Sequence, residues 1–470
     1  MSESAKTNAM VAVNNPFDGK LIQHVELNSS ADVDLALTRA HALFEDRSAW
    51  LPAYQRVEVL EKAAAIMTEQ IEELTQLAAR EGGKPYTDSK VEVLRAINGL
   101  KLAIEHIPQI KGEQIPMGHT ESSANRLAFT QREPIGVVSS ISAFNHPLNL
   151  IVHQTVPAIA VGSPVIIKPS QTTPLSCLRF VEILKEAGLP EGWCQALVVA
   201  NEDAGPLVSD SRINFFSFIG SAAVGWMLRS KLSPGTRCAL EHGGAAPVIV
   251  DKSAKMDAVI DSLLKGGFYH AGQVCVSVQR VYVHESVSQE LADKLAARAA
   301  KLKVGDPMDA ETEVGPLILP REVERVSDWV EQARQQGASV LCGGKKLSDT
   351  CYAPTVLLNP AEDATVSIKE IFGPVVCVYS YKDKSEAITR ANALPVAFQA
   401  SIYTNDLTDA LDTSSKLNAT AVMINDHTAF RVDWMPFGGR DESGIGMGGI
   451  QYSMHEMTRE KMLVIKSEVL

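Results

Sequence analysis

The chain has 470 residues and a formal net charge of −12, and a chain of this length folds into about two to four domains. Hydrophobic residues make up 45% of it and charged residues 21%, which is typical of a globular protein and excludes a disordered one. The acidic balance, without a Lys/Arg block, argues against nucleic acid and an anionic membrane surface as partners. We therefore expect a globular enzyme of the cytoplasm.

The cysteines and one uncharged segment narrow the class further. Seven cysteines stand at wide spacing without a C-x-x-C pair, so we expect neither a disulfide framework nor a metal site. The first thirty residues lack the pattern of a signal peptide. The stretch between Glu133 and Lys168 contains no charged residue, but prolines and polar residues interrupt it. We interpret it as buried strand, loop and helix, not as a membrane span.

The predicted elements change in type along the chain. Apolar residues at helical spacing predict helix from residue 32 to about residue 81, where two glycines end the run, and again over 90–106. Short β-branched segments then alternate with helical patterns, which indicates βαβ units and parallel sheets. The first series of strands is 135–142, 165–168, 196–199 and 215–219, with helices at 150–161, 174–187 and 222–232.

A second series of strands follows the first and predicts a second α/β domain. Its members are 247–250, 281–283, 356–358, 375–379, 400–403 and 421–424, largely with helices between them. Residues 462–466 form a last apolar strand after a polar stretch. An isolated terminal strand needs a partner, so we expect it to pair with a neighbouring sheet, of this or of another subunit.

Three side chains are candidates for chemistry. Cys275 follows a helical pattern, Glu241 ends a strand before two glycines, and Asn145 follows the apolar strand 135–142. Each has an ordinary interpretation: a buried small hydrophobe, a solvated charge and a turn residue. Together they supply a nucleophile, a general base and a donor to an oxyanion.

Five motifs in order make the sequence similar to the aldehyde dehydrogenase superfamily. They are F-N-H-P at 144–147, L-E-H-G-G at 240–244, G-Q-V-C at 272–275, E-I-F-G-P at 370–374 and P-F-G-G at 436–439. The resemblance implies an α/β fold with a Rossmann-like cofactor domain over 1–112 and 135–243, and a catalytic α/β domain over 244–441. It also implies a small β oligomerisation arm over 113–134 and 453–470, and assembly as a homodimer or homotetramer.

The same resemblance assigns roles to the three candidates. Cys275 is expected to attack the aldehyde as a thiolate, Asn145 to hold the oxyanion of the thiohemiacetal, and Glu241 to activate the water that hydrolyses the thioester. The implied function is NAD(P)-dependent oxidation of a small aldehyde to the carboxylic acid.

The residues that bind the cofactor are identified from the family pattern. The one G-x-G-x-x-G match, at 444–449, does not follow a strand and leaves too little chain for a βαβ unit. A strand end and helix start at 218–225 fit pyrophosphate better. The residues expected at the cofactor are Lys168, Ser170, Gln171, Gly220, Ser221, Gly225, Glu370 and Phe372. Gln171 stands where many NAD-preferring relatives have Glu, so we expect NAD and allow NADP. His242 stands where Leu is common and is expected to alter the solvation around Glu241.

Family positions also indicate the substrate tunnel. They correspond here to His146, His153 and Arg431, with Arg95 from the preceding helix. Such a cationic tunnel predicts a short aldehyde with an anionic or hydroxylated far end, such as lactaldehyde, phosphonoacetaldehyde or a sulfo-aldehyde. The alternative is that Arg431 pairs with Asp426 or Asp433 and only holds its loop.

Two rival functions stay open at this point. A CoA-acylating semialdehyde dehydrogenase uses the same cysteine, but that branch commonly lacks the general base that Glu241 would supply. A catalytically inactive structural or binding homologue would not need Cys275, Glu241 and Asn145 together.

Overall fold

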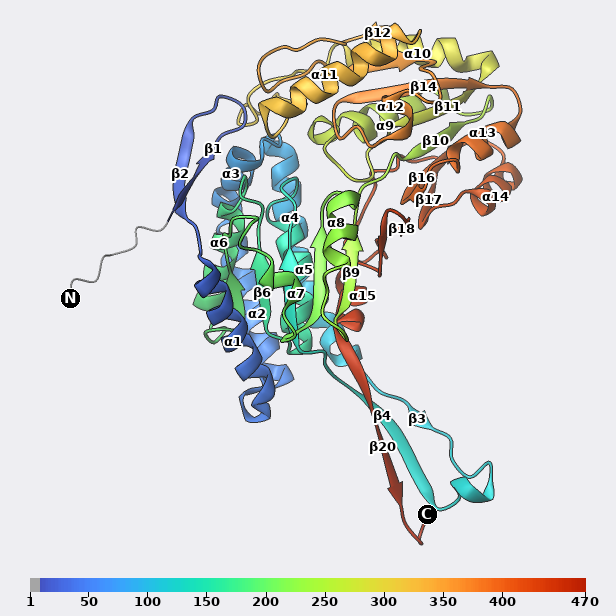
Figure 1. Ribbon diagram of the computed structural model, residues 1–470. Coiled ribbons are helices and arrows are strands. Elements are labelled where there is room, and N and C mark those ends of the chain that lie inside the picture. Colours follow the sequence, from blue (N-terminus) through green and yellow to red (C-terminus); the bar gives the residue numbers. More distant parts are fainter. Residues whose placement is uncertain (1–8) are drawn as a thin grey trace, which may run out of the picture.

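The computed structural model describes residues 9–470, which form two largely parallel sheets, helices that cover them, and a projecting arm (Figure 1). The α/β fold class expected from the sequence is confirmed. Among these residues, no helix combines the length and the apolar character that crossing a membrane requires.

The first sheet has six strands in the order β19-β9-β8-β5-β6-β7, all parallel except β19. The strands are β5 (Val137–Ile141), β6 (Val165–Lys168), β7 (Cys194–Ala196), β8 (Ile213–Ile219), β9 (Arg237–Glu241) and β19 (Gly444–Ile445). Both β5 and β6 are buried almost throughout, as in parallel strands covered on both faces.

Helices from three parts of the chain belong to this first half. They are α1 (Ser30–Glu45), α2 (Ala53–Glu69), α3 (Ile71–Gly82), α4 (Tyr86–His106), α5 (Asn149–Val161), α6 (Leu175–Glu186), α7 (Pro206–Ser209), α8 (Ala222–Arg229) and α15 (Ile450–Glu456). Every residue of α5 is buried, which is why the uncharged stretch around it is core. Helix α15 packs on α4 and α5, so residues 453–456, expected in the arm, lie against the body.

The second sheet has seven strands in the order β12-β13-β14-β11-β10-β16-β17, and only β12 and β13 pair antiparallel. The strands are β10 (Pro247–Val250), β11 (Arg280–His284), β12 (Ser339–Cys342), β13 (Thr355–Leu358), β14 (Val375–Tyr381), β16 (Gln399–Tyr403) and β17 (Ala421–Ile424). The helices of this half are α9 (Met256–Phe268), α10 (Glu285–Ala299), α11 (Pro320–Gln335), α12 (Thr365–Ile368), α13 (Lys384–Ala391) and α14 (Leu407–Lys416).

The arm is a three-stranded antiparallel sheet that projects from the body, with the C-terminus near its tip (Figure 1). It consists of β3 (Gln114–Ile115), β4 (Arg126–Pro134) and β20 (Thr458–Lys466). The predicted terminal strand thus has its partner within the chain, because β20 pairs with β4 along its whole length. Two small antiparallel pairs complete the strands: β1 (Met10–Asn14) with β2 (Leu21–Glu26), and β15 (Val396–Ala397) with β18 (Arg440–Asp441).

Four short 3-10 turns complete the elements: η1 (Arg47–Ala49), η2 (Ile107–Gln109), η3 (Glu121–Ser123) and η4 (Tyr269–Gly272). The predicted helix over 32–81 is three helices, because the chain leaves helical geometry before Ala53 and at Gln70. The predicted strand 196–199 is displaced, because β7 covers Cys194–Ala196 and shares only Ala196 with it. The predicted strand 135–142 begins only at Val137, because Gly136 has a φ of 128° that separates β4 from β5.

Candidate active site

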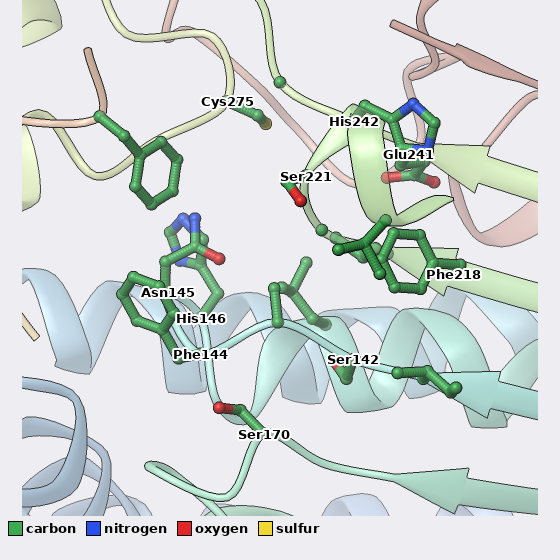
Figure 2. A pocket seen from close by; sticks show the side chains of 18 of the residues that line it. Ser142, Phe144, Asn145, His146, Ser170, Phe218, Ser221, Glu241, His242 and Cys275 are labelled. Atoms are coloured by element: carbon green, nitrogen blue, oxygen red, sulfur yellow. The ribbon is translucent and has the colours of Figure 1, made fainter. Parts of the chain in front are cut away.

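A cavity of about 850 Å³ lies at the carboxyl ends of strands in the first sheet, and residues of the second half complete its wall. Ligands of open α/β sheets bind at this edge. Cys275, Glu241 and Asn145 all line the cavity, so the fold brings the three candidates together from separate elements. Figure 2 shows Cys275 with Asn145 and His146 on one side in this view and Glu241 and His242 on the other.

Cys275 stands on a loop whose backbone is constrained. His270, Ala271 and Gly272 in η4 all have positive φ values, of 49°, 53° and 71°. Only glycine fits at 272, because a Cβ there would lie 2.1 Å from the carbonyl oxygen of Gly373. The side chain of Gln273 fixes the loop from within, donating to the carbonyl of Pro316 at 3.2 Å and accepting from the amide of Ile318 at 3.0 Å.

The Cys275 thiol is protonated at neutral pH in this environment. Burial raises its pKa to about 12; the charge of Arg431 opposes that rise, and the carboxyls of Glu370 and Glu241 add to it. A buried thiol becomes a nucleophile only as the thiolate. Arg431 is therefore the positive charge that favours ionisation of this cysteine.

Asn145 is buried and connects the first sheet to the cysteine loop. Its Nδ2 donates to the carbonyl oxygen of Gln273 at 2.9 Å. An amide NH₂ carries two hydrogens, so the second remains for a ligand. The Asn145 carbonyl accepts from Lys84 Nζ at 3.4 Å, which holds the backbone at this position.

Glu241 is the last residue of β9. Burial raises the pKa of its carboxyl, and Arg431 opposes this rise. The carboxyl lies against Gly448, where a Cβ would come within 2.1 Å of Glu241 Oε1. Among the described residues no hydrogen bond joins Glu241 to Cys275, so the two groups face the same cavity without direct contact.

His242 also lines the cavity, and its ring contacts helix α8. Its Nδ1 lies 3.0 Å from the carbonyl of Glu442, and its ring packs edge-on against Phe218 and Trp226. A Cβ at Gly225 would lie 1.9 Å from His242 Nε2. Gly225, expected among the cofactor residues, does not line the cavity and makes room for this imidazole; its place at the cofactor stays a prediction.

The other predicted cofactor residues line one end of the cavity. Lys168 Nζ donates to Asn201 Oδ1 at 3.3 Å, and burial lowers its pKa. Ser170 Oγ lies 2.8 Å from Thr172 Oγ1, and Gln171 Nε2 donates to the carbonyl of Val199 at 3.2 Å. The remaining members of this group are Gly220, Ser221, Glu370 and Phe372.

Two observations test whether this end of the cavity fits a dinucleotide. Ser221 is the N-cap of α8, but its hydroxyl makes no capping hydrogen bond, so the hydroxyl and the helix N-terminus are both available to a phosphate. Glu370 Oε1 is buried without a hydrogen-bond partner among the described residues, and burial raises the pKa of this carboxyl to about 8. A ribose hydroxyl is the type of donor that such an oxygen needs. The residues present therefore fit the group.

At the other end, His146 belongs to a buried polar cluster that the sequence did not predict. Its Nδ1 lies 2.7 Å from Lys84 Nζ, and Lys84 forms an ion pair with Glu92 of α4. Glu92 Oε1 also accepts from the amides of Leu148 and Asn149 at the start of α5. Burial and the charge of Lys84 lower the pKa of His146 to about 4, so this imidazole is neutral.

A second cluster surrounds Asp433. Arg95 donates to both carboxylate oxygens of Asp433, from Nε at 3.1 Å and Nη2 at 2.8 Å. His153 Nε2 lies 2.8 Å from Asp433 Oδ1, and Arg431 Nη2 lies 3.4 Å from His153 Nδ1. Arg95 and Arg431 line the cavity, whereas His153 does not. His153 contacts Asp433 and Arg431 instead of lining the cavity, and its expected contact with the substrate stays a prediction.

The alternative for Arg431 also fails. Among the described residues its guanidinium makes no ion pair with Asp426 or Asp433, and its Nε is buried without a hydrogen-bond partner. Its Cζ lies 3.6 Å from the centre of the Phe437 ring, a cation–π contact.

Sequence reasoning missed several residues of this site. The sequence indicated Lys84 only as part of a helix stop and did not single out Glu92; an acid next to the apolar stripe of α4 was the available signal. Asp433 was considered only as a partner of Arg431. Nothing in the sequence signalled Arg321, Glu322, Arg325 and Trp329 of α11, which also line the cavity.

Comparisons with known proteins agree with the geometry. The profile described as the aldehyde dehydrogenase family matches residues 2–463. The 3-sulfolactaldehyde dehydrogenase of Priestia aryabhattai is 37% identical over 452 residues, which cover 96% of this chain and 94% of that protein.

Two solved structures share the fold across nearly the whole chain. Aldehyde dehydrogenase 21 from Physcomitrella patens, in complex with the reaction product succinate, has a TM-score of 0.95 and 36% identity, covering 99% of this chain and 96% of that one. Glyceraldehyde-3-phosphate dehydrogenase from Methanocaldococcus jannaschii, complexed with NADP, has a TM-score of 0.93 and 35% identity, covering 97% and 99%.

Proposed function

The chain belongs to the aldehyde dehydrogenase family and is an NAD(P)-dependent oxidoreductase, and from this premise we propose that it converts a small aldehyde with an anionic or hydroxylated far end to the carboxylic acid. The relative from Priestia aryabhattai is named for a substrate that carries both a sulfonate and a hydroxyl. The neighbour from Physcomitrella patens holds succinate, a product with a carboxylate at its far end. Both support the proposed substrate class.

Cys275 is the proposed nucleophile. Its thiol gives its proton to solvent, the sulfur bonds to the aldehyde carbon, and the electron pair of the C=O π bond moves to the carbonyl oxygen, which takes the negative charge. The free hydrogen of Asn145 Nδ2 and the amide of Cys275 donate to that oxygen. Arg431 favours this step because its charge lowers the pKa of the Cys275 thiol.

The residues at the cofactor and the general base carry out the remaining steps of the proposed reaction. Lys168, Ser221 and Glu370 would hold the dinucleotide, with Ser170, Gln171, Gly220 and Phe372 around them. When bound, the dinucleotide supplies the hydride acceptor that allows a thioester to form on Cys275. Glu241 takes the proton from the water that hydrolyses the thioester, which releases the acid and the thiol. The raised pKa of Glu241 suits a base that works near neutral pH.

The observation that carries the substrate class is the unpaired Arg431 in the cavity wall. Arg95 is neutralised by Asp433, and Lys84 by Glu92. A guanidinium without a carboxylate partner is suited to a carboxylate, phosphonate or sulfonate on the substrate.

Kinetics with two aldehydes test this assignment. Arg431→Ala should lower kcat/KM for succinic semialdehyde about ten- to a hundredfold more than kcat/KM for propanal, because only the first substrate loses a charge-assisted contact. Arg334→Ala on the exposed face of α11 serves as control and should behave as wild type. An equal loss for both aldehydes in Arg431→Ala would refute the anionic substrate class.

Product analysis tests the reaction itself. The free acid should form at the same rate with and without CoA, and Cys275→Ala should form none. An acyl-CoA product would instead favour the acylating branch of the family.

Assembly and location belong to the same proposal. The arm gives a second subunit an exposed strand edge, which supports a homodimer or homotetramer. All seven cysteines are free thiols in the structure, which supports a cytoplasmic location.

A further inference from the structure

Arg95 and Arg431 line the substrate end of the cavity, and the buried Lys84 contacts His146 of its wall; two of these three cations are already balanced. Asp433 binds Arg95 through both oxygens, and Glu92 pairs with Lys84 in a fully buried contact. Arg431 is the third, and it makes no ion pair among the described residues. Arg431 is therefore the one cation of these three without an ion-paired carboxylate among the described residues, and the Glu241 carboxyl of the same cavity acts on it only electrostatically.

Arg431 is nevertheless held in place. The Phe437 ring lies under its guanidinium at 3.6 Å, and His153 Nδ1 lies 3.4 Å from its Nη2. A guanidinium has only donors, so Nδ1 of the imidazole must accept. The imidazole proton then sits on Nε2, which faces Asp433 Oδ1 at 2.8 Å. The hydrogen bonds all run in one direction, from Arg431 through His153 to Asp433.

We propose that His153, fixed in one tautomer by Asp433, is a positioning residue that orients Arg431 and leaves its charge available for the anionic group of the substrate. The inference rests on the proposed function, since it takes Arg431 as the contact of that group. A carboxylate at position 153 would hold the guanidinium equally well, but it would cancel the charge. A neutral acceptor orients the side chain without doing so.

Asp433 fixes the direction of this series of hydrogen bonds. An imidazole with its proton on Nδ1 would present a donor to the donor of Arg431, and the carboxylate opposite Nε2 excludes that tautomer. The carboxylate is bound by Arg95, by His153 and by Asn149 Nδ2 at 3.4 Å, and it makes no ion pair with Arg431 among the described residues. Burial, together with the charge of Arg431, lowers the pKa of His153 to about 4, which agrees with a neutral ring.

Three substitutions at position 153 separate orientation from charge. His153→Gln keeps a neutral side chain that can accept from Arg431 and donate to Asp433. His153→Glu keeps the acceptor but adds a negative charge, and His153→Phe removes the acceptor while it retains a ring. His119→Glu, in the exposed loop of the arm, introduces the same change far from the cavity.

The measurement is kcat and KM for succinic semialdehyde and for propanal, expressed as the ratio of the two kcat/KM values. We expect His153→Glu to lower this preference for the anionic aldehyde about ten- to a hundredfold, chiefly through KM. His153→Phe should lower it less, while His153→Gln and His119→Glu should retain it. A purely structural role would change both aldehydes alike and would leave the ratio unchanged.

Arg431→Ala in the same series distinguishes a failure of the proposed substrate class from a failure of the role proposed for His153. If Arg431→Ala leaves the ratio at the wild-type value, the proposed substrate class fails. If Arg431→Ala abolishes the preference but His153→Glu and His153→Phe retain it, the substrate class stands and the role of His153 is overturned. Thermal unfolding of each variant shows whether its fold is intact, and propanal turnover reports the same for the catalytic loop.

Discussion

Cys275 reacts only as a thiolate, and two opposing effects decide how much thiolate it forms. Burial raises its pKa to about 12, and Arg431 lowers it. Below the pKa the thiolate fraction rises about tenfold per pH unit, so alkylation of Cys275 by iodoacetamide should accelerate from pH 7 to pH 9 without a plateau. Arg431→Met should slow alkylation at each pH, because the pKa of Cys275 then rises further.

Peptide mass spectrometry measures this rate separately at each cysteine. Cys342 is partly exposed on the second sheet, away from the cavity, and its alkylation should be the same in wild type and in Arg431→Met. A plateau near pH 7 at Cys275, or equal rates in both proteins, would contradict the electrostatic role given to Arg431.

At the scale of elements, the contact between α4 and α5 depends on one buried pair. Glu92 of α4 accepts from the first amides of α5 and pairs with Lys84. Although burial alone would raise its pKa, Lys84 and His146 hold the pKa of Glu92 below its ordinary value. Lys84→Met should cost about 3–5 kcal/mol near neutral pH, since it leaves a buried carboxylate without its partner.

The loss should depend on pH with a definite sign. In Lys84→Met burial prevails and the pKa of Glu92 rises, so the variant is most stable when Glu92 is protonated and loses stability as pH rises through the raised pKa. The wild type keeps its pair from pH 5 to pH 8. Urea unfolding should therefore show a smaller difference at pH 5 than at pH 8, whereas Lys62→Met on the exposed face of α2 should show none. A pH-independent difference would contradict this account.

The sequence predicts an element or a site residue when the pattern that specifies it is local in the sequence. Strands 165–168, 247–250 and 421–424 match β6, β10 and β17, because a short apolar β-branched run carries its own signal. The break at Gln70 has no strong breaker residue, so the helix division there was missed. Cys275, Glu241 and Asn145 were predicted from motifs, whereas the partners Lys84, Glu92 and Asp433 were not. Their contacts span 8 to 338 positions, and tertiary packing alone brings most of them together.

At the scale of the whole molecule, the arm is the part whose apolar edge strand stays exposed in a single subunit. Its edge strand β20 presents Met462 at 58% and Val464 at 49% relative exposure, two positions apart and hence on one face. An exposed apolar edge strand is suited to a second copy of a chain. The proposed homodimer or homotetramer places its contact here.

Charge on this face should therefore separate the subunits. Met462→Glu together with Val464→Glu should shift the mass measured by light scattering after gel filtration from that of an oligomer to that of a monomer, because two like charges would meet across the interface. Circular dichroism should stay unchanged, since β20 still pairs with β4 along its length. Lys466→Glu changes the charge at the end of the same strand but removes no apolar surface, so it should keep the wild-type mass. If the wild type is a monomer, or if the double variant keeps the oligomeric mass, the arm is not the contact between subunits.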